Sequence, residues 1–377
     1  MSSRKVPNEI EARINRRRSE YAVSRRREFL AAKRRTAQAG AVKGDYSWRI
    51  NRMIIKVPEV LDLVDHRANT LEVAAACRSN CMIHKKRTLL DFSATKTISS
   101  AAVLFLVAEI DRCRKVSGIA MLTGTFPRDK RLNRQMRDSG FYDALGVKCD
   151  IPQRERIYPV EYIKVRSGTA ADGRLAVELR QALLGPHEEQ LAKDKRGSFF
   201  RGITEAMTNV AQHAYPDDWD NGPIKVIKKG WWMLGHINKL SKQLKIMIVD
   251  QGIGIPRSLP RTHKDVIPAL LAMLKLENSD GAMIHAAMEL GRSRLEQSHR
   301  GKGLNDLKQI IDLCQEGTLR ILSKKGEYLY RVRGGQCLPT IVSGHQDSLN
   351  GTLVEWSIPL DAILPFLLIN EVGNEEK

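Results

Sequence analysis

The amino-acid sequence predicts a mixed α/β (α+β) protein that carries a basic helical arm and two compact domains. Its 377 residues exceed one typical domain of about 100–200 residues. Apolar residues make up 42% and charged residues 28%, a balance typical of a globular chain with a sizeable core. From Trp48 onward, strand-like and helix-like segments alternate, and this alternation favours layered α/β domains.

The first element is the arm, residues 1–47. Residues 8–39 contain no Pro or Gly and are rich in Arg, Ala and Glu, which predicts a helix. Residues 1–43 hold 13 basic and 4 acidic side chains, so +9 of the total charge of +19 lies there. This concentration favours a polyanionic partner, namely nucleic acid, an anionic membrane surface or an acidic protein. The alternative is a solvated helix that only confers solubility.

The sequence also indicates a compartment. No apolar run approaches the roughly 18–20 residues that span a bilayer, so no transmembrane segment is expected. The chain is charged from Arg4 onward without the apolar region of a secretory signal. The six cysteines are scattered rather than arranged as a disulfide framework. We therefore expect a cytoplasmic protein.

The first domain is predicted over residues 48–166. Its expected strands are Arg49–Val57, Leu89–Phe92 and Ile119–Leu122, and its expected helices are Pro58–Asn80, Ala101–Arg114 and Arg131–Ser139. Residues 151–166 look irregular, and the small polar stretch 167–173 marks the domain boundary.

The second domain is predicted over residues 167–362, followed by a short tail, 363–377. The expected helices are Leu175–Leu184, Ser198–His213 and Leu304–Cys314, and the expected strands are Ile224–Lys228, Leu244–Val249, Thr318–Leu322, Tyr328–Val332 and Thr352–Ile358.

Four short motifs of this second domain carry chemistry. Asp250 ends a hydrophobic strand and is followed by Gly252 and Gly254, so an acceptor for an exocyclic amine lies beside backbone that a flat ligand can approach closely. Glu205 and Asn209 are spaced i and i+4, on one face of the predicted helix. A carboxylate there could deprotonate a water, and an amide oxygen could complete the oxygen shell of Mg²⁺.

The third motif is Arg300-Gly301-Lys302-Gly303-Leu304, which immediately precedes a helix. Backbone N–H groups and a helix N-terminus converge there and favour an anion. The fourth motif is Asn350-Gly351-Thr352, at the start of the last strand.

In this order, the four motifs resemble the GHKL (Bergerat-fold) superfamily of ATP-binding domains, whose fold is a two-layer α/β sandwich. The resemblance covers roughly Leu175–Leu360, and residues 203–215 look most like the anti-sigma-factor and serine-kinase branch. It implies ATP and Mg²⁺ as cofactors. By this resemblance Glu205 is the general base, Asn209 the Mg²⁺ ligand and Asp250 the adenine reader. Gly252 and Gly254 shape the base pocket.

The same resemblance assigns the remaining motifs. Residues 300–304 form the phosphate lid, in which Gly301 and Gly303 are hinges, and Thr352 lines the nucleotide pocket. Family members often carry a basic residue three positions after the Asn, whereas this chain has Gln212. Arg300 or Lys302 could supply that charge, or phosphoryl chemistry could be slow.

Residues 87–145 resemble a STAS domain, the fold of anti-sigma-factor antagonists, through the stretch Leu89–Val103 and the segment 132–145. In that family a serine at a helix start is phosphorylated, and Ser100 falls at this position. The alternative is that the serine only caps the helix. Ser99 and Ala102 depart from the family's usual aspartate and glycine.

These observations lead to one functional hypothesis and two alternatives. The hypothesis is a slowly hydrolysing, Mg-dependent ATP-binding switch, an ATPase of GHKL type, whose nucleotide state controls a regulatory protein partner. The first alternative is a protein serine kinase of the anti-sigma type, and the second is a nucleic-acid-associated ATPase subunit of a larger assembly. A homodimer is compatible with each of them.

Overall fold

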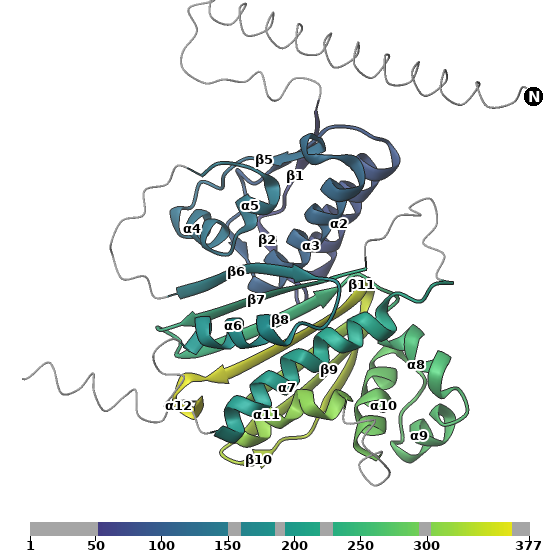
Figure 1. Cartoon of the computed structure of the whole chain (residues 1–377). Helices are drawn as coiled ribbons and strands as arrows, with labels where there is room; N and C mark the ends of the chain where they lie inside the picture. Colours follow the sequence, from purple (N-terminus) through teal and green to yellow (C-terminus); the bar gives the residue numbers. More distant parts are fainter. Residues whose placement is uncertain (1–51, 150–159, 185–192, 219–228, 294–302, 364–377) are drawn as a thin grey trace, which may run out of the picture. The chain divides into compact units, whose positions relative to one another are not determined.

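A six-stranded antiparallel sheet, a three-stranded parallel sheet and a two-stranded parallel pair organise the described part of the chain (Figure 1). The computed structural model describes residues 52–149, 160–184, 193–218, 229–293 and 303–363. The predicted arm, the predicted strand 224–228 and all of the predicted tail except Ile363 lie outside these residues. The described residues from Met53 onward belong to one compact unit.

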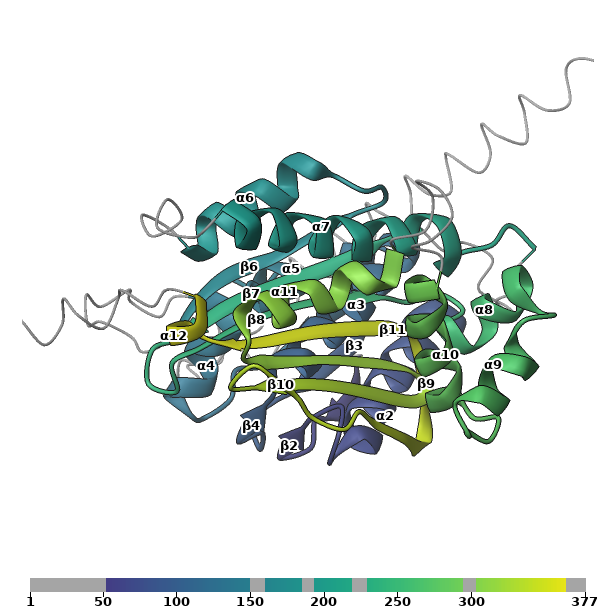
Figure 2. The ribbon, with the colours of Figure 1, turned by 90° about the horizontal axis from the view of Figure 1, so that it is seen from below.

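The larger sheet has six antiparallel strands in the order β10-β9-β11-β8-β7-β6 (Figure 2). Their bounds are β6 Val160–Gly168, β7 Trp231–Asn238, β8 Gln243–Asp250, β9 Gly317–Arg333, β10 Gln336–Cys337 and β11 Ile341–Pro359. The register between β11 and β9 shifts between Gly344 and Leu349 and again between Leu349 and Thr352. Such bulges commonly lie beside functional sites.

Helices α6, α7 and α11 cover one face of this sheet (Figures 1 and 2). Their bounds are α6 Gly173–Leu184, α7 Lys193–Asn209 and α11 Asp306–Cys314, and α12, Leu360–Ile363, follows β11. The apolar positions of α7, including Ile203 and Met207, are buried, as their helical spacing predicts. A π-helical turn, Val210–Ala214, extends α7.

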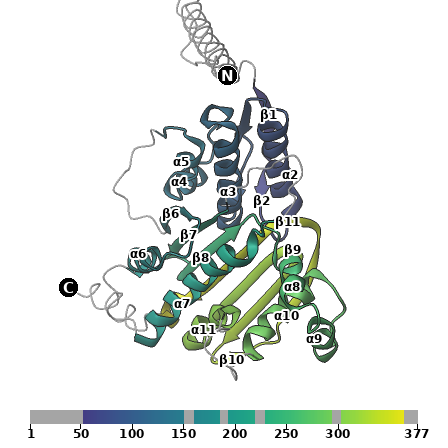
Figure 3. The same ribbon diagram turned by 45° about the vertical axis from the view of Figure 1, so that its right-hand side comes forward.

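Three further helices, α8 Ile255–His263, α9 Ile267–Met273 and α10 Asp280–Ser293, lie together beside β9 (Figure 3). They share a small apolar core of their own, which includes Leu259, Leu271 and Ala286. Helix α10 packs against β9.

Residues 53–149, which we call the N-terminal layer, contain a three-stranded parallel sheet in the order β1-β3-β5 and a parallel pair, β2-β4. The strands are β1 Met53–Lys56, β2 Val60–Leu61, β3 Thr88–Asp91, β4 Thr97–Ile98 and β5 Leu122–Gly124. The helices are α2 Arg67–Arg78, α3 Ser100–Ser117, α4 Lys130–Asp138 and α5 Phe141–Leu145.

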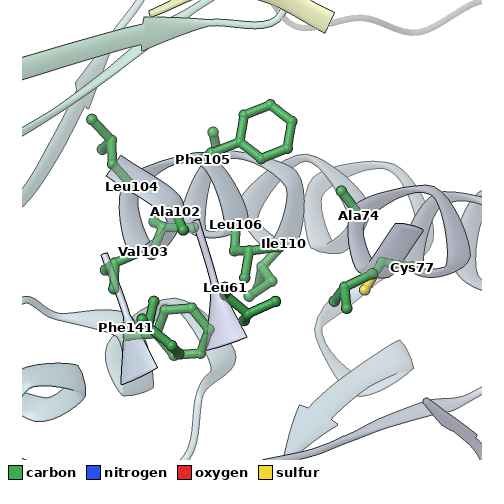
Figure 4. Close-up of a cluster of buried hydrophobic side chains, with 14 of the residues drawn as sticks. Leu61, Ala74, Cys77, Ala102, Val103, Leu104, Phe105, Leu106, Ile110 and Phe141 are labelled. Atoms are coloured by element: carbon green, nitrogen blue, oxygen red, sulfur yellow. The ribbon is translucent and has the colours of Figure 1, made fainter. Parts of the chain in front are cut away.

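Helix α3 is the centre of this layer (Figure 4). Every side chain from Ala101 to Ile110 is buried, because α3 packs against β7 and β8 of the large sheet as well as against its own layer. A helix whose apolar side chains lie on all of its faces is normally buried on all of them, and the stretch Ala101–Ala108 of α3 has this composition. The same hydrophobic core therefore contains Phe105 and Phe141 of the layer and Trp232 and Val249 of the large sheet.

The mixed α/β class is confirmed, and the differences from the predicted elements have local causes. The helix predicted from Pro58 begins only at Arg67, because β2 occupies Val60–Leu61. The sequence does not predict strand β7, because its first six residues are all buried and show no alternating pattern. Strand β6 spans the boundary predicted at residue 167 and pairs with β7. Within the described ranges, no helix is both long and apolar enough to cross a bilayer.

Candidate functional site

A cavity of about 850 Å³ is lined by α7, the end of β8, the interior of β11, and helices α8 and α10. It brings together residues from every predicted motif of the second domain. The full lining is Glu205, Ala206, Thr208, Asn209, Val210, Gln212, His213, Ala214, Ile248, Val249, Asp250, Gly254, Ile255, Ser258, Leu259, Thr262, His263, Ala287, Leu290, Leu304, Leu307, Thr352 and Val354.

Asp250 is the last residue of β8 and is only 5% exposed. Its Oδ1 accepts a hydrogen bond of 2.7 Å from the backbone N–H of Gly252. Burial raises the pKa of this carboxyl to about 7, against the opposing effects of the Gly252 and Thr352 amides and of the Lys324 charge. Asp250 is therefore a buried group that titrates near neutrality, and its anionic form can accept a hydrogen bond from a ligand amine.

The two glycines after Asp250 have different roles. A Cβ on Gly252 would lie 2.1 Å from the carbonyl oxygen of Ala214, at the end of α7. The next residue, Ile253, donates its N–H to that same oxygen at 2.8 Å. Gly252 thus lets the loop pack directly on α7. Gly254 has a φ of +81°, precedes α8 and lines the cavity itself.

Glu205 and Asn209 both reach the cavity from α7, one helical turn apart. Burial and the nearby Asp306 charge raise the pKa of Glu205, while the Asn209 side chain opposes this rise. The Nδ2 of Asn209 is buried and makes no hydrogen bond of good geometry within the described residues. The site thus contains a proton acceptor of raised pKa and an amide with unused hydrogen-bonding capacity.

Thr352 lines the cavity from β11 and pairs with the hydroxyl of Ser323, a residue that belongs to none of the sequence motifs. The Oγ of Ser323 in β9 lies 2.9 Å from Thr352 Oγ1 and accepts the N–H of Ile255 at 2.9 Å. Ser323 is fully buried and joins β9, β11 and the start of α8. Nothing in the local sequence marks this serine, because its neighbours are brought together only by the fold.

Gly351 belongs to the fourth motif, and the structure gives it a specific role. Its φ is +87°, and a Cβ there would lie 2.0 Å from the backbone oxygen of Asp250. Only glycine fits this close approach of β11 to the end of β8. The sequence places the Asn350-Gly351-Thr352 motif at the start of a strand, but it does not indicate the contact with Asp250.

The predicted phosphate lid is partly described. Arg300, Gly301 and Lys302 lie outside the described residues. Gly303 begins a 3₁₀ turn, Gly303–Asn305, that leads into α11, and Leu304 lines the cavity. Gln212 lies at the cavity where the resemblance leads one to expect a cation. Among the described lining residues there is no Lys or Arg, although His213 and His263 are present.

Ser100 lies apart from this cavity. It is the first residue of α3, and its Oγ is 3.1 Å from Nε2 of His236 in β7. Burial lowers the pKa of His236 to about 4, so this imidazole is neutral. The side chain of Ser99, rather than that of Ser100, accepts the capping hydrogen bond from the Ala102 N–H. The phosphoacceptor role of Ser100 stays a prediction.

No protein-family model and no curated protein matches the chain. Among solved structures, it is similar to the 43K ATPase domain of Thermus thermophilus gyrase B in complex with an aminocoumarin. Identity is 19% and the TM-score is 0.17, over 33% of this chain and 27% of that one. The chain is also similar to the N-terminal domain of a DNA repair protein, with 14% identity and a TM-score of 0.16 over 35% and 32% of the two chains. The match thus covers less than a third of either structure, and neither TM-score defines the fold of this chain.

Proposed function

We propose that this chain binds Mg·ATP in the cavity beneath α7. The observation that carries the proposal is the convergence of Glu205, Asn209, Asp250, Gly254 and Thr352 on one cavity, from three segments far apart in the sequence. A concave, largely apolar site with a few convergent polar groups and titratable residues of shifted pKa is the usual form of a ligand site.

The residues present fit adenine and a magnesium ion. Asp250 offers a buried carboxylate to an exocyclic amine, and the apolar side chains of Ile248, Leu259 and Val354 could flank a flat ring. The Nδ2 of Asn209 makes no good hydrogen bond within the described residues, so it could donate to a phosphate oxygen, whereas the Oδ1 of the same amide is the atom that could ligate Mg²⁺. When bound, Mg²⁺ would neutralise phosphate charge and would keep several waters.

Glu205 is the proposed general base of a slow hydrolysis. Its raised pKa suits a carboxylate that removes a proton from an attacking water. The described lining offers no Lys or Arg to stabilise the charge that develops on the phosphoryl oxygens. Slow turnover follows unless Arg300 or Lys302 completes the site. A slow cycle with two long-lived nucleotide states is what a regulatory switch requires, and we propose that these states control a protein partner.

Ligand-dependent thermal stability tests the binding proposal. Saturation at about a hundredfold excess over Kd adds about 2.7 kcal/mol to the native state. Mg·ATP should therefore raise the melting temperature of the wild-type protein. Asp250→Ala and Asn209→Ala should remove that rise, whereas Asp217→Ala, which alters a carboxylate that is 97% exposed, should keep it. A wild-type protein that is not stabilised by millimolar nucleotide would refute the proposal.

Two assays separate the alternative functions. Transfer of the γ-phosphate to a protein serine would identify a kinase, whereas release of phosphate to water would support the switch. For the nucleic-acid alternative, deleting residues 2–43 should flatten the salt dependence of duplex binding, since each phosphate contact contributes about −0.9 to that slope. If the full-length protein and the deletion variant bind the duplex equally, or if neither binds it, the arm does not contribute to nucleic-acid binding.

A further inference from the structure

A buried carboxylate in the N-terminal layer is bonded to the loop of the candidate nucleotide site. Glu109, on α3, has no exposed surface. It accepts hydrogen bonds from Nη1 of Arg78 at 2.7 Å, Nη2 of Arg112 at 3.3 Å and Nε2 of Gln251 at 3.1 Å. The first two donors belong to the N-terminal layer, and the third is the residue immediately after Asp250.

Gln251 makes hydrogen bonds through both its side chain and its backbone N–H. Its side chain, with only 1% of the residue exposed, is anchored to Glu109 in the N-terminal layer. Its backbone N–H donates to the hydroxyl of Tyr215 at 3.0 Å, and that hydroxyl donates to the Gly230 carbonyl at 2.7 Å. Gln251 does not line the cavity. Any effect that it has on a ligand must therefore pass through its neighbours Asp250 and Gly252.

Breaking the hydrogen bond from Gln251 to Glu109 without exposing the two groups to water is energetically unfavourable. The acceptor of this bond, the Glu109 carboxyl, is buried and paired with two arginines, and hydrogen bonds within such ion-paired groups are roughly twice as strong as those between neutral groups. If the layer moved away, the Nε2 of Gln251 would lose its partner, and its Oε1 already has none among the described residues. The position of the loop therefore depends on the layer remaining in contact.

We propose that the N-terminal layer positions the Asp250–Gly254 loop through the bond between Glu109 and Gln251, so that the layer's docking and nucleotide binding favour each other. Gln251 and Glu109 are positioning residues in this scheme. The proposal rests on the proposed function, and it makes the N-terminal layer the regulatory element of the nucleotide site. Because coupling between two sites is reciprocal, a nucleotide that fixes the loop must also hold the layer more firmly.

A second hydrogen bond between the layer and the large sheet supplies a matched control. Asp111, two residues from Glu109 on α3, accepts the indole N–H of Trp232 in β7 at 2.9 Å. This bond joins the same helix to the same sheet, but it does not involve the loop. If loss of either bond affected nucleotide affinity only by loosening the packing of α3 on the sheet, breaking the Asp111–Trp232 bond should weaken binding as much as breaking the Glu109–Gln251 bond.

The experiment measures Mg·ATP affinity by calorimetry in the full chain. Gln251→Leu keeps both arginine partners of Glu109 and should weaken binding by about fivefold or more, the lower end of typical coupling between sites. Asp111→Ala, which removes the acceptor of the Trp232 indole N–H, should leave the affinity unchanged. Adding Glu109→Gln to Gln251→Leu should weaken binding no further, because the bond is already absent. Unchanged affinity in Gln251→Leu, or an equal loss in Asp111→Ala, would overturn the proposal.

Hydrogen exchange, compared with and without nucleotide in the same protein, provides a second test, and its first arm uses the wild-type protein alone. In the wild-type protein, Mg·ATP should slow amide exchange in α3 as well as in α7. In Gln251→Leu at saturating nucleotide, the protection should persist in α7 and disappear from α3. Protection of α7 alone in the wild type would refute the coupling while leaving the binding site intact. A wild-type protein that binds no nucleotide at all would instead refute the proposed function.

Discussion

Lowering the pH should weaken Mg·ATP binding through a single carboxyl group, that of Asp250. Burial raises its pKa to about 7 in the free protein, so the group is mostly ionised at about pH 8 and mostly protonated at about pH 6. The ionised form is the stronger acceptor of a hydrogen bond from an exocyclic amine. Below the pKa of Asp250, tight binding is therefore coupled to the loss of a proton from this carboxyl.

The size of the effect follows from the ionised fraction of Asp250. With a pKa of about 7, that fraction is about 0.9 at pH 8 and about 0.1 at pH 6. If binding requires the anion, Kd should rise about tenfold between the two pH values, which corresponds to about 1.4 kcal/mol. Three other titratable groups line the cavity, namely Glu205, His213 and His263. Burial lowers the pKa of His213, and burial together with the Asp306 charge raises the pKa of Glu205.

Calorimetric titration of Mg·ATP at about pH 6, 7 and 8 measures this dependence. Asp250→Asn is the matched control, because it keeps an acceptor oxygen and leaves both His213 and Glu205 in place. Its affinity should vary little over the same range. A wild-type Kd that does not change with pH, or the same slope in Asp250→Asn, would show that Asp250 does not read the ligand in its ionised form.

Two further predictions concern the same cavity. Glu205→Gln should keep Mg·ATP affinity within a few-fold while turnover falls by about 10² or more, the usual contribution of a general base; equal turnover in steady-state phosphate release would exclude that role. Gly252→Ala should lower the free energy of unfolding by about 1–3 kcal/mol, because its Cβ would lie 2.1 Å from the Ala214 oxygen. Gly173→Ala, at the start of α6, meets only the Phe200 ring at 3.4 Å and should be near neutral in the same denaturant titration.

Much of the local structure could be predicted from the sequence, because it depends on local patterns. The apolar stripe of α7 and the acid-glycine motif after β8 both appear in the structure where the pattern indicated them. Helix α3 was also predicted, over 101–114, close to its observed bounds. The spacing of Glu205 and Asn209 was enough to place both on one helix face, since the period of an α-helix is fixed.

Contacts between distant segments were decided only by the tertiary structure. The sequence indicates Asp250 as a candidate, but its raised pKa arises from burial in the folded chain, where Gly351 of β11 lies against it, and no local pattern encodes this burial. Ser323 and Gly351 acquire their roles because β9 and β11 bring them to the end of β8. Likewise, the uninterrupted apolar run of α3 predicts that the helix is buried, but it does not predict which elements cover it. Only the fold brings Glu109 to Gln251, 142 positions further along the chain. Chain connectivity fixes neighbours within a turn or a strand, whereas the partner of a buried charge depends on how the layers pack.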